Sequence, residues 1–240
     1  MMRFFKGFAL AFNMLSIFPF FKIHNFFKGI NGYAVTSYPL VGFILGSILW
    51  ALHTIFSPYI PSTHLAIIIF GMWVLITGAL HLDGFCDTVD GLFVAKEKAL
   101  EVMKDPHNGG MGMIFGGVFL ILKASSLASF DAFYLLPVIL MLSRFNASLA
   151  IYLYPYLSKN GIGSLAKEEF NQNLFFITLL YPIAVGMWVS WSLVFVSLAI
   201  LFLSKKFFIK RYGGFTGDIY GFVIELSELV LLNAIIMGLT

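Results

Sequence analysis

Long apolar stretches, separated by short polar connections, recur along the whole chain. A helix needs about 20 apolar residues to cross the hydrocarbon core of a membrane, and eight stretches approach that length. They cover residues 4–20, 33–56, 64–82, 111–130, 132–153, 174–189, 190–204 and 219–238. Because backbone groups inside a bilayer must be satisfied within the structure, this pattern predicts an all-α, polytopic membrane helical bundle. We expect one membrane-embedded catalytic domain over residues 1–240.

The first apolar stretch differs from the others because polar and helix-breaking residues interrupt it. These are Asn13, Ser16 and Pro19. We therefore expect an interfacial or re-entrant N-terminal helix and about seven transmembrane helices, with eight full spans as the alternative. No small-residue cleavage site follows this stretch, so we expect it to be retained. Farther along, residues 174–204 predict either a tight helical hairpin or one long helix with an irregular break.

Basic residues are confined to one set of connections between the apolar stretches. The alternating connections, at 57–63, around Asp131 and at 188–191, carry no Lys or Arg. Because positively charged loops stay in the cytoplasm, we expect the four basic connections on that side of the membrane. Their basic residues are Lys22 and Lys28, Lys96, Lys98 and Lys104, Lys159 and Lys167, and Lys205, Lys206, Lys210 and Arg211.

The composition agrees with a membrane protein and narrows the classes of function. The chain is 60% hydrophobic and only 11% charged, which is not the balance of a soluble globular domain. Its net charge of +3 indicates no nucleic-acid partner, because the basic loops account for it. The single cysteine, Cys86, excludes an internal disulfide. The sequence does not fix the oligomeric state, so a homo-oligomer stays open.

A cluster of acidic residues follows the third apolar stretch. Asp83, Asp87 and Asp90 occupy positions i, i+4 and i+7, which form one stripe on a helix. Three carboxylates on one face repel each other unless a cation joins them. Mg²⁺ suits such a site, because it takes oxygen ligands and is held by one or two carboxylates plus substrate phosphates. We expect Gly84 and Gly91 to let a bulky ligand approach; a plain solvated helix end is the simpler alternative.

A second motif, residues 103–112, is a Pro- and Gly-rich loop that runs into the fourth apolar stretch. Exposed amides at such a helix start bind anions, so Gly109 and Gly112 are candidate substrate-binding positions. Lys104 and His107 add positive charge that suits a diphosphate. The alternative is a helix stop and restart in which the glycines serve packing.

A third motif, residues 213–218, precedes the last apolar stretch, which carries Glu225 and Glu228. Asp218 shares a helical face with both glutamates, and it is interpreted either as a ligand or as the cap of this helix. The glutamates lie two to three turns into an apolar helix and must face a partner or a polar cavity.

Two cations inside apolar stretches are candidate partners for these glutamates. Lys123 lies in the fourth stretch and Arg144 in the fifth. Arg144 forms an internal ion pair with Glu225 or Glu228, or else these charges bind an anionic or amide-rich substrate; the sequence leaves both open. His81 and Cys86 lie off the acidic stripe and are interpreted as packing residues.

Together these residues indicate a phosphoryl-transfer site. A carboxylate-bound Mg²⁺ and a basic glycine-rich loop would hold a diphosphate, and a free Asp would take the proton of an attacking hydroxyl. The alternative from another class is a transporter, which would more often show paired halves in its sequence. No such repeat is visible.

The three motifs closely resemble, in the same order, those of the cobalamin synthase family, the adenosylcobinamide-GDP ribazoletransferases. The resemblance is carried by residues 77–91, 99–112 and 213–218, with Glu225 and Glu228. Two departures concern basic residues: no Arg stands in 15–18 before Pro19, and His107 takes a place that is often Arg. The CDP-alcohol phosphotransferases also place Asp residues at a helix end, but Gly91 is not followed here by their Ala-Arg. UbiA-type prenyltransferases match the third motif poorly.

The resemblance implies a reaction, a cofactor and a location. The enzyme would join adenosylcobinamide-GDP to α-ribazole or its 5′-phosphate and release GMP, which completes the nucleotide loop of cobalamin. It would depend on Mg²⁺ and lie in the prokaryotic cytoplasmic (inner) membrane with its site facing the cytoplasm. By position, the resemblance implies that Asp83, Asp87 and Asp90 are the metal ligands. It implies that the catalytic residues are these three with Lys104, Asp105 and Asp218. The implied substrate-binding residues are His107, Gly109, Gly112, Lys123, Arg144, Gly214, Thr216, Glu225 and Glu228.

Overall fold

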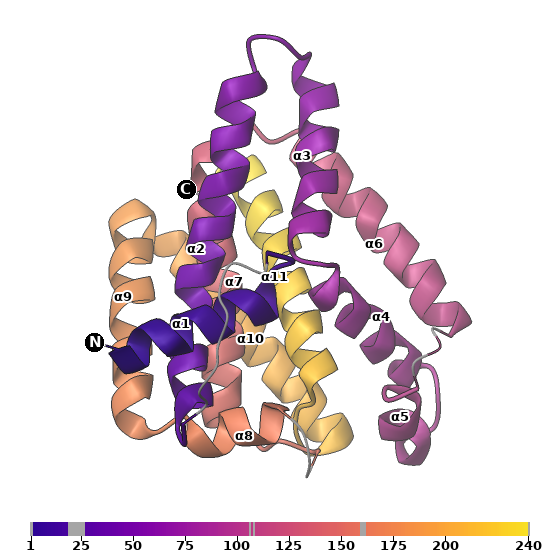
Figure 1. Cartoon of the computed structure of the whole chain (residues 1–240). Helices are drawn as coiled ribbons and strands as arrows, with labels where there is room; N and C mark the ends of the chain where they lie inside the picture. Colours follow the sequence, from indigo (N-terminus) through magenta and orange to yellow (C-terminus); the bar gives the residue numbers. More distant parts are fainter. Residues whose placement is uncertain (1, 19–26, 106, 108, 159–161, 240) are drawn as a thin grey trace.

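The computed structural model describes residues 2–18, 27–105, 107, 109–158 and 162–239 (Figure 1). Lys22 and Lys159 of the basic connections lie outside the described residues, as does Pro19. The described residues fold almost entirely into helices, in the order α1 (Met2–Leu15), α2 (Ile30–Phe56), α3 (Ser62–Ile76), α4 (Leu80–Leu92), α5 (Lys96–Val102), α6 (Gly110–Ala128), a short 3₁₀ turn η1 (Phe133–Leu135), α7 (Leu136–Leu153), α8 (Ile162–Glu169), α9 (Gln172–Val189), α10 (Trp191–Tyr212) and α11 (Gly217–Ile236).

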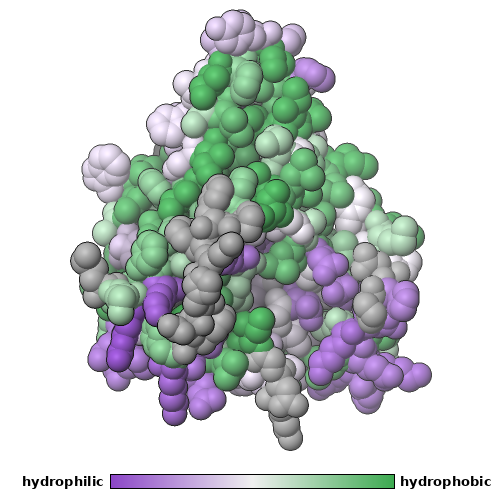
Figure 2. All heavy atoms as spheres, viewed as in Figure 1, coloured by the Kyte–Doolittle hydropathy of each residue, from purple (hydrophilic) through white to green (hydrophobic). Residues whose placement is uncertain are grey.

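The prediction of a polytopic helical membrane protein is confirmed. Within the described residues, six helices are long and apolar enough to cross a membrane, and a seventh span results if the bent pair α3 and α4 counts as one. Figure 2 shows hydrophobic residues over α2, α3 and α6, whereas hydrophilic residues gather at the opposite end, over α5 and α8. The chain therefore has an apolar belt and one strongly polar end.

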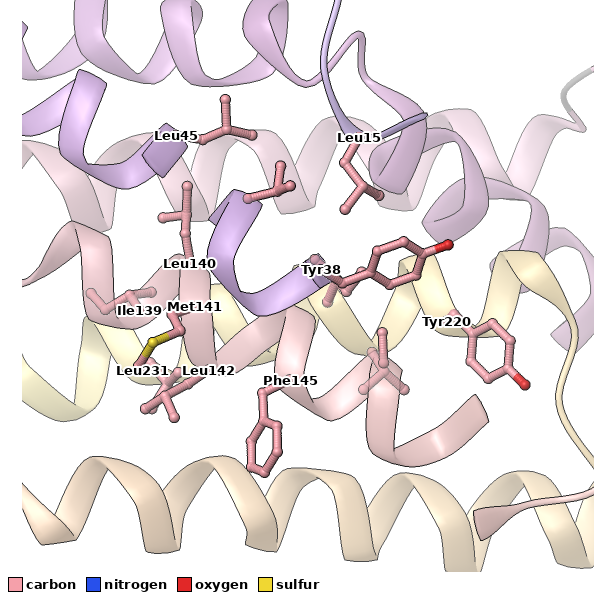
Figure 3. Close-up of a cluster of buried hydrophobic side chains, with 14 of the residues drawn as sticks. Leu15, Tyr38, Leu45, Ile139, Leu140, Met141, Leu142, Phe145, Tyr220 and Leu231 are labelled. Atoms are coloured by element: carbon pink, nitrogen blue, oxygen red, sulfur yellow. The ribbon is translucent and has the colours of Figure 1, made fainter. Parts of the chain in front are cut away.

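Helix α7 is the centre of the bundle, and almost all of its residues are buried. Helix α2 packs closely along it because glycines remove the side chains between them: a Cβ on Gly42 would lie 2.2 Å from the Leu140 carbonyl oxygen. Side chains from α2, α7 and α11, such as Leu45, Ile139 and Leu231, complete the core (Figure 3). This core fixes the positions of the helices that carry the polar motifs.

The structure decides between the alternatives left open for the N-terminal stretch and for residues 174–204. Helix α1 has 14 residues, about 21 Å of helix, which is too short to span, and it lies across α2 (Figure 1). The chain between 174 and 204 is a hairpin, because α10 starts directly after Ser190 and packs back on α9, where a Cβ on Gly186 would lie 2.6 Å from the Val194 side chain. Helix α10 then continues to Tyr212, beyond the predicted end at 204.

The predicted span 64–82 is wrong at its end, because the helix stops at Ile76. Gly78 and Ala79 adopt φ values of 62° and 54°, in the left-handed region that ends a helix. After them α4 starts in a new direction, at 82° to α3. The acidic motif consequently lies on a separate helix and not on a continuation of the span.

Candidate functional site

The acidic helix α4 packs against the start of α11, which brings two of the motifs together. A Cβ on Gly84 would lie 3.0 Å from the Asp218 backbone, and one on Gly221 would lie 3.0 Å from the His81 carbonyl oxygen. The expectation that Gly91 admits a ligand is wrong, since a Cβ there would meet the Met103 side chain. Gly84 packs against Asp218 but also lines a cavity, so its expected role stays a prediction.

Asp83, Asp87 and Asp218 form an acidic group at this helix crossing. Asp83 is exposed, and the other two are half-buried. The charges of Asp83 and Asp218 both act on Asp87, and Lys104 is the cation that acts on Asp218. The arrangement concentrates negative charge where a cation or a cationic complex can approach.

The third motif places Asp218 through its backbone. Gly213, with φ 84°, ends α10, and a Cβ on Gly214 would lie 2.6 Å from the Pro155 carbonyl oxygen. The Phe215 N–H donates to that same oxygen at 2.8 Å. Thr216 then caps α11, because its Oγ1 accepts from the Ile219 N–H at 3.3 Å. Asp218 is thus not the cap, and Gly214 and Thr216 act here as positioning residues.

The third acid of the stripe has a different environment from the other two. Asp90 is buried and accepts hydrogen bonds from the Gly109 N–H at 2.8 Å and the Gly112 N–H at 2.7 Å. A helix N-terminus favours a negative charge, so the Asp90 carboxylate occupies the anion position at the start of α6. A metal role for Asp90, or an anion role for these two amides, would require this contact to open.

The basic loop between α5 and α6 is exposed. Lys104, Asp105 and His107 all face solvent, and His107 Nδ1 lies 2.8 Å from Asp105 Oδ1. Hydrogen bonds from the backbone and ring of His107 lower the pKa of Asp105 below its ordinary value. This pair is exposed to solvent, and its contact lies within the loop. Pro106 and Asn108 of the same motif lie outside the described residues.

Four buried charges form a separate network inside the bundle. Lys123 donates to Glu225 at 2.6 Å and also to Glu228, while Arg144 donates to Glu228. The internal ion pair is therefore the arrangement found, with Glu228 and not Glu225 as the direct partner of Arg144. Two cations and two carboxylates balance, which a low-dielectric interior requires. These residues contact each other and not an open surface, so their predicted substrate-binding role stays a prediction.

A cavity of about 260 Å³ opens beside the acidic group. Asp83 and Asp218 lie at its edge, and His81, Tyr156 and Tyr220 line it. Burial, and then the Asp218 charge, raises the pKa of Tyr156, so this ring presents a neutral phenol. The sequence interpretation of His81 as packing missed this cavity. The sequence feature that could have indicated a role for His81 was its position directly before the acidic stripe, two residues from Asp83.

The donor set fits Mg²⁺ in type but not as a complete protein cage. Among the described residues, no group of three or more His, Cys, Asp or Glu side chains is close enough to hold a metal ion. Mg²⁺ normally needs only one or two carboxylates, because waters and substrate phosphates complete its octahedron. Asp83 and Asp87, one helical turn apart, meet that requirement.

Comparisons with known proteins identify relatives of this chain. A protein named adenosylcobinamide-GDP ribazoletransferase from Desulfitobacterium hafniense is 37% identical over 81% of this chain and 82% of its own length. Proteins of the same name from Desulforamulus reducens and Thermosynechococcus vestitus are 35% identical (98% of this chain, 97% of theirs) and 36% identical (83% and 84%). No solved structure matches significantly. The family profile described as cobalamin-5-phosphate synthase matches residues 7–236, and the chain belongs to this family.

Proposed function

We propose that this chain joins adenosylcobinamide-GDP to α-ribazole, or to its 5′-phosphate, and releases GMP, which is the last nucleotide-loop step of cobalamin synthesis. One observation carries the proposal. The acids of α4 meet the start of α11 and the basic loop before α6, so the three family motifs converge at one end of the bundle. Relatives that match most of the chain bear the name of this activity.

The chemistry follows from the placement of the charges. A hydroxyl of the riboside attacks the phosphorus on the cobinamide side of the diphosphate, the bond from that phosphorus to the bridging oxygen breaks, and GMP leaves with that oxygen. Asp83 or Asp218, both at the edge of the cavity, takes the hydroxyl proton. Lys104 and His107, which are exposed on the loop, would contact the phosphates.

Mg²⁺ is part of this proposal. Asp83 and Asp87 would hold the ion, and the Asp218 charge would add to the negative field around it. When bound, it would neutralise the diphosphate and stabilise the departing phosphate. Without a cation, the acidic group would repel the diphosphate that it must receive.

We further propose that the chain lies in the prokaryotic cytoplasmic membrane with the site facing the cytoplasm. The lysines of α5 and of the end of α10 are exposed, and hydrophilic residues gather over α5 (Figure 2). The connection Ser57–Pro61, at the opposite end of α2, has no Lys or Arg. The positive-inside rule therefore favours a cytoplasmic polar end.

A GMP-release assay tests the activity. Purified protein in detergent is incubated with adenosylcobinamide-GDP, with and without α-ribazole and Mg²⁺. Release of GMP only when all three are present supports the proposal. GMP release without riboside would indicate a hydrolase, and riboside or corrinoid flux into proteoliposomes without GMP would indicate a transporter; either result contradicts it.

A further inference from the structure

The cavity beside the acidic group has an apolar and aromatic wall. Ala147 and Ile151 of α7 and Ile224 of α11 supply aliphatic surface. The rings of Tyr156 and Tyr220 lie nearly parallel, with an interplanar angle of 14° and centroids 6.0 Å apart. Tyr38 and Leu15 close the cavity from α2 and α1, at the end of the core where Figure 3 shows them near Tyr220. Such a lining favours a flat, largely apolar group.

Two buried polar atoms of this wall have no partner. His81 is 4% exposed and Tyr220 is 7% exposed. Within the described part of the chain, neither His81 Nε2 nor the Tyr220 hydroxyl makes a hydrogen bond. A buried polar group without a partner costs about 1–3 kcal/mol, so such atoms in a cavity wall indicate a ligand that satisfies them.

Arg144 determines which nitrogen of His81 carries the proton. The Arg144 guanidinium lies 3.4 Å from His81 Nδ1. A guanidinium has donors only, so Nδ1 must accept, and in a neutral imidazole the proton then sits on Nε2. Glu228 and Ser143 hold the guanidinium in place. Arg144 is thus a positioning residue, and His81, which lines the cavity, carries an N–H donor and not a base on Nε2.

We propose that this cavity binds the heterocyclic base of the riboside acceptor, with the His81 Nε2–H donating to the ring nitrogen that does not carry the sugar. The inference rests on the proposed function. A benzimidazole-type base is flat and apolar and has one such acceptor nitrogen, which matches the wall and its donor. The corrin macrocycle is too large for about 260 Å³. With the base in the cavity, the sugar hydroxyls point to Asp83 and Asp218 at its edge.

A ligand pair tests the donor on the unmodified protein. 1-Methylbenzimidazole and 1-methylindole have the same shape, but only the first has the acceptor nitrogen. Each is used to displace α-ribazole from the purified chain in detergent, measured by equilibrium dialysis. We expect 1-methylbenzimidazole to compete roughly tenfold better, the effect of one hydrogen bond of about 1.4 kcal/mol. Equal competition by the two compounds would overturn the proposal.

Variants locate the donor on His81. His81→Leu should weaken α-ribazole binding roughly tenfold, while His81→Gln, whose amide N–H₂ can reach the same position, should stay within about threefold of wild type. His64→Leu, on the exposed start of α3, is the matched control and should bind normally. Normal α-ribazole binding by His81→Leu would contradict the assignment.

The two proposals fail in distinguishable ways. Binding needs no turnover, so a protein that binds α-ribazole through His81 but releases no GMP would refute the activity alone. In turnover, His81→Leu should raise KM for α-ribazole and leave KM for adenosylcobinamide-GDP within about twofold. A rise confined to the corrinoid substrate would assign the cavity to the other ligand and overturn the inference.

Discussion

Asp83 and Asp87 differ from Asp90, the third acid of α4, because their carboxylates remain available at the helix crossing. Asp90, by contrast, is bonded to the amides of Gly109 and Gly112 at the start of α6. We therefore predict that Asp83→Asn or Asp87→Asn lowers GMP release by at least about 10³-fold, because each change removes a carboxylate on which Mg²⁺ and the diphosphate depend. The same assay at saturating Mg²⁺ checks this.

Asp131→Asn is the matched control, since Asp131 is exposed at the end of the bundle that lacks basic residues. It should retain wild-type turnover and the same elution volume in size-exclusion chromatography. Full activity of Asp83→Asn would remove the metal-site proposal, whereas loss of folding in both α4 variants would show that these acids act structurally.

Spacing predicted the acids of the site but not their different roles. The i, i+4, i+7 pattern placed three carboxylates on one helix, and the structure has them there. Which of them is buried depends on what packs against α4, and of the three acids it is Asp90 that the start of α6 covers. Similarly, the sequence showed His81 as an isolated histidine. Its role depends on Arg144, which lies 63 positions later in the chain. Contacts between distant segments leave no periodic trace in a single sequence.

At the scale of elements, Gly112 is where α6 meets α4. A Cβ there would lie 2.3 Å from Asp90 Oδ2 and 2.8 Å from the Cys86 carbonyl oxygen. Gly112→Ala should therefore push the two helices apart, break the bond to Asp90 and lower the melting temperature by several degrees. Thermal unfolding in detergent, followed by circular dichroism, measures this change.

Gly117, in the same helix, provides the comparison. A Cβ on Gly117 would meet nothing within 4 Å. Gly117→Ala should leave the melting temperature unchanged or raise it, since alanine favours a helix over glycine by about 0.5–1 kcal/mol. If both variants melted alike, the close α4–α6 contact would not be a stability determinant.

The apolar pattern predicted which helices exist better than where they end. Most predicted stretches coincide with helices within a few residues, because lipid exposure and core burial both select apolar side chains. The bend between α3 and α4 was missed, since Gly78 and Ala79 are apolar and continue the hydropathy of the span. Helix α10 was expected to end at its lysines, but Lys205, Lys206 and Lys210 stay helical at the polar end.

At the scale of the whole molecule, the buried charges tie the neighbouring helices α6 and α7 to α11, which lies far along the chain. Lys123 lies on α6, Arg144 on α7 and Glu225 with Glu228 on α11. Arg144→Met should destabilise the fold by about 3–5 kcal/mol, because it leaves Glu228 with an unbalanced buried charge.

The double variant Arg144→Met, Glu228→Met separates charge balance from the loss of contacts. It keeps the neutral pair Lys123–Glu225, so it should be less destabilised than the sum of the two single variants. Unfolding free energies of the wild type, the two single variants and the double variant, measured by denaturant titration in mixed micelles, complete this double-mutant cycle. Strict additivity would mean that Arg144 and Glu228 do not interact.

The direction of the chain in the membrane determines which substrates can reach the site. The α2–α3 connection and the polar end with α5 lie at opposite ends of the molecule (Figure 1), so one cysteine on each reports the orientation. In a Cys86→Ser background, Lys98→Cys should react with a membrane-impermeant maleimide only in inside-out vesicles, and Tyr59→Cys only in intact spheroplasts. Both positions are exposed, so each cysteine is accessible from its own side.

The reverse labelling pattern would place Asp83 and Asp218 outside the cytoplasm, away from nucleotide substrates, and would contradict the proposed orientation. The positive-inside rule makes that reversal costly, because the lysines of α5 and the end of α10 would all have to cross the bilayer.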